Sequence, residues 1–283
     1  SNAMHTPLND HATAPTQYIE VNGTRYAYRS LGAPSDIPLI CFQHFTGTLD
    51  NWDPLITNGL SKGRQLIIFD NKGVGLSSGT TPDNVAAMTA DALEFITALG
   101  IRYFDVLGFS LGGFIVQYMA HIQPDMIRKI IIVGAAPQGV KVLHTFPDLI
   151  ARAMQLEPKE RFLFIFFEQS EHSRSKGLAT LGRLYERTTD RDQDASAQAI
   201  GAQLTAITNW GKKTPSFEIT SIQHPVFVVQ GSNDEMMDTY NSYELFKQLP
   251  DAILSLYPDA AHGSFYQYPE LFVSQTEYFL DSY

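Results

Sequence analysis

The chain has 283 residues, 44% of them hydrophobic and 18% charged, so it can bury a substantial core and is not disordered by composition. Acidic residues outnumber basic ones by 30 to 20, which makes the formal net charge −10 at pH 7. Nucleic acids and anionic membranes bind clustered Lys and Arg, so this balance argues against both as partners. Residues 1–3, ahead of Met4, resemble the remnant of an expression tag and carry no weight in the fold prediction.

The cysteine content and the lengths of the apolar segments bear on the compartment. Cys41 is the only cysteine, which excludes an intrachain disulfide and favours a reducing compartment. It lies in an apolar run, where a buried and unreactive thiol is expected. No apolar stretch approaches the roughly 20 residues of a membrane-spanning helix, and residues 4–16 lack the apolar core of a signal peptide. A cytoplasmic globular protein without a membrane partner is predicted.

The first elements in chain order are strands. Two short alternating segments, 17–22 and 24–29, flank Asn22-Gly23, and Asn-Gly between such segments is a strong hairpin signal. Later apolar runs show no alternation, which is typical of strands in a parallel sheet covered on both faces. These runs occupy residues 38–45, 65–70, 104–109, 130–134 and 225–230.

Helical patterns separate the strand-like runs. The clearest covers 82–99, where apolar residues recur at helical spacing. Thr81 is placed to cap this helix, Pro82 fits its first turn, and Gly100 fits its C-terminal end. The alternation of strands and helices predicts an α/β fold with a mostly parallel central sheet flanked by helices.

The alternation stops between about 140 and 212. That stretch carries no obvious strand and contains helical, aromatic-rich sequence at 161–167, so an all-helical insertion is expected. The alternation then resumes, with a helix at 239–249, a strand at 252–257 and a final helix from about 266. The predicted organisation is an α/β core formed by 4–139 and 213–283, with the helical insertion at 140–212.

A serine follows one of the buried strands within the sequence V-L-G-F-S-L-G-G at 106–113. A reversal from strand to helix as sharp as this one crowds the backbone, so Gly108 and Gly112 are sterically required. The turn would present the Ser110 hydroxyl at the carboxyl edge of the sheet, where open α/β folds bind ligands. It would also aim the Leu111 N–H, at the start of a helix, toward a developing negative charge.

A serine needs a base to take its proton, and the base needs an acid to orient it. Asp234 follows the strand at 225–230, and His262 follows the next strand, so both fall at the same sheet edge as Ser110. The chain order of serine, acid and histidine is that of a known catalytic arrangement. Glu235 and Asp238 are rival acids, but Asp234 fits the spacing best. No pair of histidines has metal-ligand spacing, so neither a metal nor another cofactor is predicted.

With these residues the chain resembles the α/β-hydrolase fold superfamily. The likeness extends over nearly all of 17–283 and is closest to the capped branches with a serine nucleophile. It implies a triad of Ser110, Asp234 and His262, and a cap formed by 140–212 over the active site. Four motifs carry the likeness: G-F-S-L-G-G at 108–113, D-N-K-G-V-G-L-S-S at 70–78, G-S-N-D at 231–234 and D-A-A-H-G at 259–263.

One segment departs from the family pattern. The family has H-G-F or H-G-x after its third strand, and the last residue donates an N–H to the oxyanion. This chain has Gln43-His44-Phe45 there when it is counted back from Trp52, which nominates Phe45 as the donor beside Leu111. Alignment on His44 instead nominates Thr46. His44 itself is expected to shape this loop or to pack beneath it.

The resemblance implies a hydrolase that cleaves an ester or a similar small acyl compound through an acyl-enzyme. Perhydrolysis of the haloperoxidase type and carbon–carbon bond hydrolysis are alternatives on the same triad. A ligand sensor with negligible turnover is an alternative of another class. The expected partner in each case is a small molecule, and the contacts that would choose among them lie in the cap.

Overall fold

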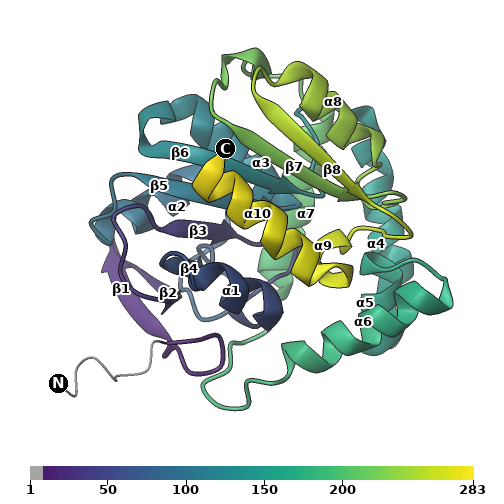
Figure 1. The fold of residues 1–283 in the computed structure, drawn as a ribbon, viewed down its shortest axis with the longest axis horizontal. Helices are drawn as coiled ribbons and strands as arrows, with labels where there is room; N and C mark the ends of the chain where they lie inside the picture. The colour runs from purple at the N-terminus through teal and green to yellow at the C-terminus, as the bar shows by residue number, and fades with distance from the viewer. Residues whose placement is uncertain (1–8) are drawn as a thin grey trace.

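The structure is a computed structural model that describes residues 9–283, and the predicted tag remnant at 1–3 lies outside them. Its centre is an eight-stranded sheet with the order β1-β2-β4-β3-β5-β6-β7-β8 (Figure 1). The first three strands in this order pair antiparallel, and the pairs from β4 through β8 are all parallel. The strands are β1 (Gln17–Val21), β2 (Thr24–Leu31), β3 (Leu39–Phe42), β4 (Leu66–Phe69), β5 (Phe104–Phe109), β6 (Ile127–Val133), β7 (Val226–Gly231) and β8 (Ala252–Tyr257). The predicted fold class is confirmed.

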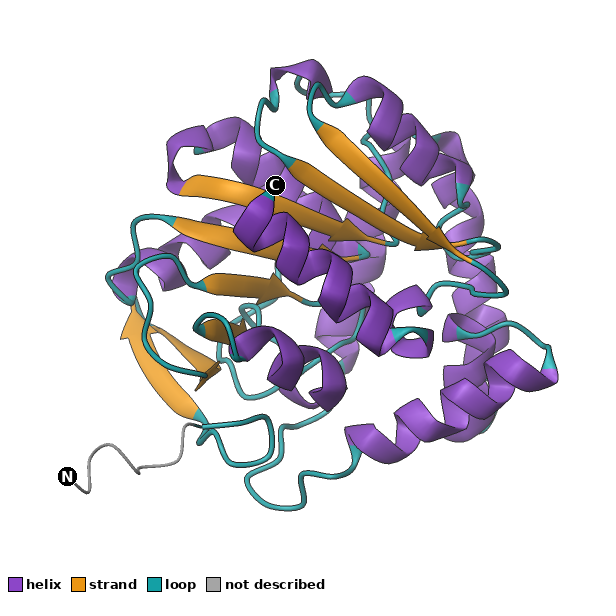
Figure 2. Cartoon of the chain, in the orientation of Figure 1, coloured by secondary structure: helices purple, strands orange, loops and turns teal. Residues whose placement is uncertain are grey.

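The parallel strands bury side chains on both faces, as their continuous apolar runs predict. In β3, Ile40 and Phe42 face one hydrophobic core, whereas Leu39 and Cys41 face the other. Helices cover both faces of the sheet (Figure 2). The first core packs against α2 (Val85–Ala98), α3 (Leu111–Ile122) and α8 (Tyr240–Gln248), and the second against α1 (Pro54–Ser61) and α10 (Pro269–Ser282). Cys41 is buried as expected, and burial raises the pKa of its thiol.

Several predicted boundaries are wrong, each for a local reason. Gln43, His44 and Phe45 leave the sheet after β3 and form a loop. The cap of α2 is Asn84, whose side chain accepts a hydrogen bond from Ala87 N at 2.8 Å. Thr81 is engaged elsewhere, because its hydroxyl donates to Lys72 O. The C-terminal helix is preceded by a separate short helix, α9 (Ser264–Gln267), because α10 begins at a proline that cannot continue a preceding helix.

The predicted Asn22-Gly23 hairpin is present. Both residues have positive φ, 48° and 81°, as a tight two-residue turn between twisted strands requires. Gly100, also at positive φ, follows the end of α2 as expected. Short 3-10 helices complete the described part of the chain at Leu49–Asn51, Pro124–Met126, Lys141–Thr145 and Ile219–Ser221.

Four α-helices lie between β6 and β7, and residues 134–225, all of them described, contain no strand. They are α4 (Phe146–Met154), α5 (Pro158–Phe166), α6 (Glu171–Leu184) and α7 (Ala197–Lys212), named here the helical insertion. The strands β5 to β8 point toward α4, α5 and α6 (Figures 1 and 2). The helix α7 is anchored to the core, where Trp210 stacks on Phe114 with ring centres 5.1 Å apart. The insertion therefore extends over the carboxyl edge of the sheet.

Candidate active site

Ser110 occupies a strained turn between β5 and α3. Its backbone has φ 57° and ψ −114°, a region that L-residues enter only when the surrounding structure holds them there. A Cβ on Gly108 would lie 2.3 Å from Gly112 O, and one on Gly112 would lie 2.0 Å from Phe42 O. The steric requirement for both glycines is thus confirmed. The strain fixes the serine at the point where the strand meets the helix.

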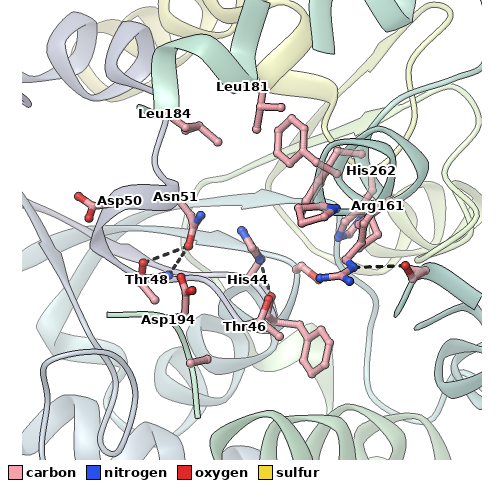
Figure 3. Close-up of a pocket in the computed structure, with 18 of the residues that line it drawn as sticks. His44, Thr46, Thr48, Asp50, Asn51, Arg161, Leu181, Leu184, Asp194 and His262 are labelled. Atoms are coloured by element: carbon pink, nitrogen blue, oxygen red, sulfur yellow. Dashed lines mark hydrogen bonds between the residues drawn. The ribbon is translucent and has the colours of Figure 1, made fainter. Parts of the chain in front are cut away.

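The Ser110 hydroxyl is buried and has no hydrogen-bond partner within residues 9–283, His262 included. Both residues nevertheless line one cavity (Figure 3 labels His262). Catalytic hydrogen bonds often form only when substrate is bound. The hydroxyl is thus not committed to another group in the described part of the protein.

Asp234 and His262 form a close buried pair. His262 Nδ1 donates to Asp234 Oδ2 over 2.7 Å, and the two side chains are 4% and 0% exposed. Because a carboxylate only accepts hydrogen bonds, the proton of the neutral ring is on Nδ1 and the lone pair is on Nε2. Of the three acids weighed from the sequence, Glu235 and Asp238 are exposed, and Asp234 is the one bonded to His262.

Three further donors hold the Asp234 carboxylate. Its Oδ1 accepts the backbone N–H groups of Met236 at 2.9 Å and Met237 at 3.0 Å, and its Oδ2 accepts Gln230 Nε2 at 2.8 Å. Such donors stabilise the ionised form and fix its orientation. Gln230 was not identified from the sequence, although its place four residues before the acid, at the end of β7, was a usable signal.

The loop after β3 provides backbone donors beside the serine. Thr46, which has φ +65°, donates its N–H to Gln203 Oε1 of α7 at 2.7 Å. The Phe45 N–H has no acceptor within the described residues. Leu111 is the first residue of α3, so its N–H has no acceptor in its own helix. Two backbone donors, at Phe45 and Leu111, are thus open near Ser110.

His44 packs inside this loop and also borders the cavity. Its Nδ1 lies 2.6 Å from Phe45 O, and its ring is 5.3 Å from that of Phe109 and 5.2 Å from that of Phe166. Burial lowers the pKa of His44 to about 4, and the bond to Phe45 O opposes this effect only in part. The expectation that His44 shapes the loop agrees with the bond, but its ring lies beside the cavity as well.

The cavity has a volume of about 680 Å³, within the range of small-molecule sites. Part of its wall is apolar and combines core and insertion side chains, including Phe45, Phe146, Ile150, Phe162, Ile165, Phe166, Ile200, Met236 and Tyr266. Within the aromatic run 161–167, Phe162 and Phe166 line the cavity whereas Phe164 and Phe167 do not.

The cavity also has a polar lining, and Figure 3 shows Asp50 and Asp194 on the side away from Arg161. Asp50 forms a buried ion pair with Arg29 at 2.7 Å and accepts Asp192 N at 2.6 Å. These contacts join residues far apart in the sequence, so sequence reasoning missed them. They tie the segment after α6 to the core.

Within residues 9–283 no three His, Cys, Asp or Glu side chains converge in an arrangement that could hold a metal ion. The same part of the chain contains no helix with the length and apolarity needed to span a membrane.

Comparison with known families adds to this geometry. The sequence model of the alpha/beta hydrolase fold family matches residues 37–269, which is most of the chain. The protein is an α/β-hydrolase. As a member of this family it is an enzyme of the hydrolase type.

Named relatives of this α/β-hydrolase differ in their chemistry. A protein of Agrobacterium fabrum whose name proposes a carbamate hydrolase is 26% identical over 83% of this chain and 89% of its own length. A non-heme chloroperoxidase of Streptomyces lividans is 23% identical over 88% of this chain and 94% of its own. Among solved structures, an esterase of Thermogutta terrifontis matches with a TM-score of 0.72 at 16% identity, covering 94% of this chain and 98% of its own. The structural likeness supports the fold, and the family alone does not determine the substrate.

Proposed function

We propose that this α/β-hydrolase is a serine hydrolase that cleaves an ester or a similar small acyl compound through an acyl-enzyme. One observation carries the proposal. Ser110 is held in a strained turn and lines the same cavity as His262, whose Nδ1 is hydrogen-bonded to the buried carboxylate of Asp234. That arrangement of nucleophile, base and orienting acid is what serine needs for attack on a carbonyl.

In the proposed first step, His262 Nε2 takes the proton of Ser110 Oγ as the oxygen attacks the substrate carbonyl. Asp234 keeps the imidazole in the required tautomer and stabilises the imidazolium that forms. The tetrahedral intermediate then collapses, and the leaving alcohol takes the proton from His262. The acyl group remains on Ser110.

In the second step, His262 accepts a proton from water as the water attacks the acyl-enzyme. When the bond to Ser110 breaks, His262 returns this proton to Ser110 Oγ and the acid is released. In both steps the negative oxygen would be bound by the N–H groups of Phe45 and Leu111. Phe45 is favoured over Thr46 because the Thr46 N–H already donates to Gln203. Loss of one such donor costs roughly 100- to 1000-fold in turnover.

The substrate would be a small molecule enclosed between core and insertion. The apolar part of the wall suits an acyl chain, and the helical insertion would act as a cap because all four of its helices, α4 to α7, contribute to the lining. Enclosure of this kind excludes water from the reacting centre and strengthens its electrostatic interactions.

The test is hydrolysis of p-nitrophenyl esters from acetate to octanoate, together with labelling by a fluorophosphonate. We expect labelling at Ser110 and an optimum at one chain length. Both should disappear in Ser110→Ala, whereas Ser61→Ala, which alters a buried serine of α1 that does not line the cavity, should retain them. Labelling without ester turnover would reject the ester substrate and favour carbon–carbon hydrolysis or sensing. Absence of both would reject the enzyme mechanism.

A further inference from the structure

His44 places an imidazole directly before the proposed oxyanion donor, at the position aligned with the glycine of the H-G-F pattern. Its Nδ1 lies 2.6 Å from Phe45 O, and a carbonyl oxygen can only accept a hydrogen bond. The Nδ1 atom therefore carries the proton. In the neutral ring this leaves Nε2 as an acceptor with a free lone pair.

The Nε2 atom of His44 is open to the cavity. It makes no hydrogen bond within residues 9–283, and the protein does not enclose it completely. His44 also lines the cavity, where Figure 3 shows its second ring nitrogen on the side away from the bond to the carbonyl oxygen. A ligand in the cavity can therefore reach this acceptor.

Two observations place His44 close to the reacting centre. Its Cα is two covalent bonds from Phe45 N, the proposed donor to the oxyanion. Its ring also contacts the same two phenyl rings as His262: Phe109 lies 5.3 Å from His44 and 5.1 Å from His262, and Phe166 lies 5.2 Å and 5.8 Å from them. The two imidazoles thus flank one small region beside Ser110.

We propose that His44 is a specificity-determining residue whose Nε2 accepts a hydrogen bond from an N–H or O–H group on the substrate, beside the scissile carbonyl. The preferred substrates are then acyl compounds with a donor one or two atoms from that carbonyl, such as 2-hydroxy esters. This inference rests on the proposed function, because it requires an acyl substrate on Ser110.

The protonation state of His44 agrees with an acceptor role. With a pKa of about 4 the ring is neutral at pH 7, and its conjugate acid is too strong for Nε2 to serve as an efficient general base there. The phenyl rings of Phe109 and Phe166 lie beside the His44 ring. A substrate donor that lies there but does not reach Nε2 is therefore left without a hydrogen-bond partner. An unpaired buried donor is costly, which is how a single acceptor separates related substrates.

The test compares p-nitrophenyl esters of 2-hydroxybutanoate, 2-methoxybutanoate and butanoate. The methoxy and unsubstituted esters lack the donor and bracket the hydroxy ester in size. We expect the wild-type enzyme to favour the hydroxy ester in kcat/KM by roughly 3- to 10-fold over both, the contribution of one net hydrogen bond.

Two variants separate the acceptor from the structural bond to Phe45 O. In His44→Asn the side-chain amide can replace Nδ1 as donor to that carbonyl but does not reach the position of Nε2. In His44→Gln the longer side chain can place an oxygen near the position of Nε2 while the donor at Nδ1 is lost. We expect the ratio of kcat/KM for the hydroxy ester to that for the other two esters to fall to about 1 in His44→Asn and to persist in His44→Gln. The melting temperature of each variant serves as a folding control.

Three outcomes overturn the proposal: no preference in the wild type, an unchanged preference in His44→Asn, or equal loss in both variants, which would assign the effect to loop structure. The proposed function is tested separately by the butanoate ester. If its hydrolysis persists in Ser110→Ala, the serine mechanism fails. If it depends on Ser110 but no ester preference responds to His44, the inference about His44 alone fails.

Discussion

Two loops at the carboxyl edge of the sheet each bring a histidine to the same cavity, and the two rings have different partners. The loop after β8 holds His262 through a carboxylate, at 2.7 Å from Asp234 Oδ2. The loop after β3 holds His44 through a neutral carbonyl, at 2.6 Å from Phe45 O. Both rings are buried and both pack against Phe109 and Phe166.

The charge of the partner separates the roles that the two rings can have. A carboxylate stabilises an imidazolium, which fits the role of base proposed for His262. A carbonyl compensates little of the cost of burying a charge, so His44 stays neutral and offers an acceptor. Similar surroundings therefore suit one ring to proton transfer and the other to recognition.

The largest expected effect comes from removing the charge beside His262. Asp234→Asn should lower kcat for ester hydrolysis by about 10⁴-fold, because an amide favours the wrong tautomer and does not stabilise the imidazolium. Steady-state kinetics on the best p-nitrophenyl ester measures this loss. Asp105→Asn is the matched control, since Asp105 is also buried but pairs with Arg128 outside the cavity. Equal losses of kcat in the two variants would contradict the assignment.

The neutral state of His44 predicts a pH dependence of stability. The unfolded ring titrates near 6.5 and the folded ring near 4, so between these values the unfolded chain binds a proton that the folded chain does not. The contribution of His44 is therefore complete above pH 6.5 and declines as the pH falls toward 4, by up to roughly 3 kcal/mol.

Urea unfolding of the wild type and of His44→Gln at pH 7 and pH 4.5 measures this difference. The variant should lose less free energy of unfolding on acidification than the wild type does. His11→Gln is a parallel case, because burial also lowers the pKa of His11 to about 4. An identical pH response in the wild type and His44→Gln would show that folding does not lower the pKa of His44.

A smaller effect is expected from crowding the His262 ring. Gly134 follows β6 with φ +60°, and a Cβ there would lie 3.2 Å from His262 Nδ1 and Cε1. Gly134→Ala should destabilise the fold by about 1–2 kcal/mol through the positive φ and should lower turnover about tenfold by displacing the ring.

Gly23→Ala is the matched control for that variant. Gly23 has φ +81°, but a Cβ there would meet nothing within 4 Å. Thermal unfolding should show similar losses of stability in both variants, whereas kcat should fall only in Gly134→Ala. A fall of kcat in both would indicate that stability, and not the position of His262, limits activity.

Much of the fold was predictable because its signals are local. Continuous apolar runs indicate strands that are buried on both faces, and Asn22-Gly23 indicates a tight hairpin. The errors lie at boundaries where a distant partner competes with a local one. Thr81 is a good helix cap by type, yet its hydroxyl donates to Lys72 O, and Asn84 caps α2 instead.

The candidate site likewise contains residues that the sequence predicts and contacts that it does not. The residues proposed as nucleophile, acid and base were nominated from the sequence because each follows a strand end at the same sheet edge. Gln203, which engages Thr46 from a helix 157 positions along the chain, gave no such signal. The pairing of Asp50 with Arg29 and with the segment after α6 was equally invisible, since nothing in a local pattern specifies which distant charges meet.

By itself, the sequence determined the family, the sheet and the sharp turn at Ser110, because hydrophobic patterning and glycine sterics act between near neighbours. The tertiary structure alone decided the surroundings of the two histidines and the neutral state of His44. Burial and the charge of the partner control the protonation of an imidazole, and both arise only when separate loops and the helical insertion close around one cavity. His44 illustrates this point: in the sequence it marks a departure from a motif, and in the fold it is a neutral acceptor facing the cavity.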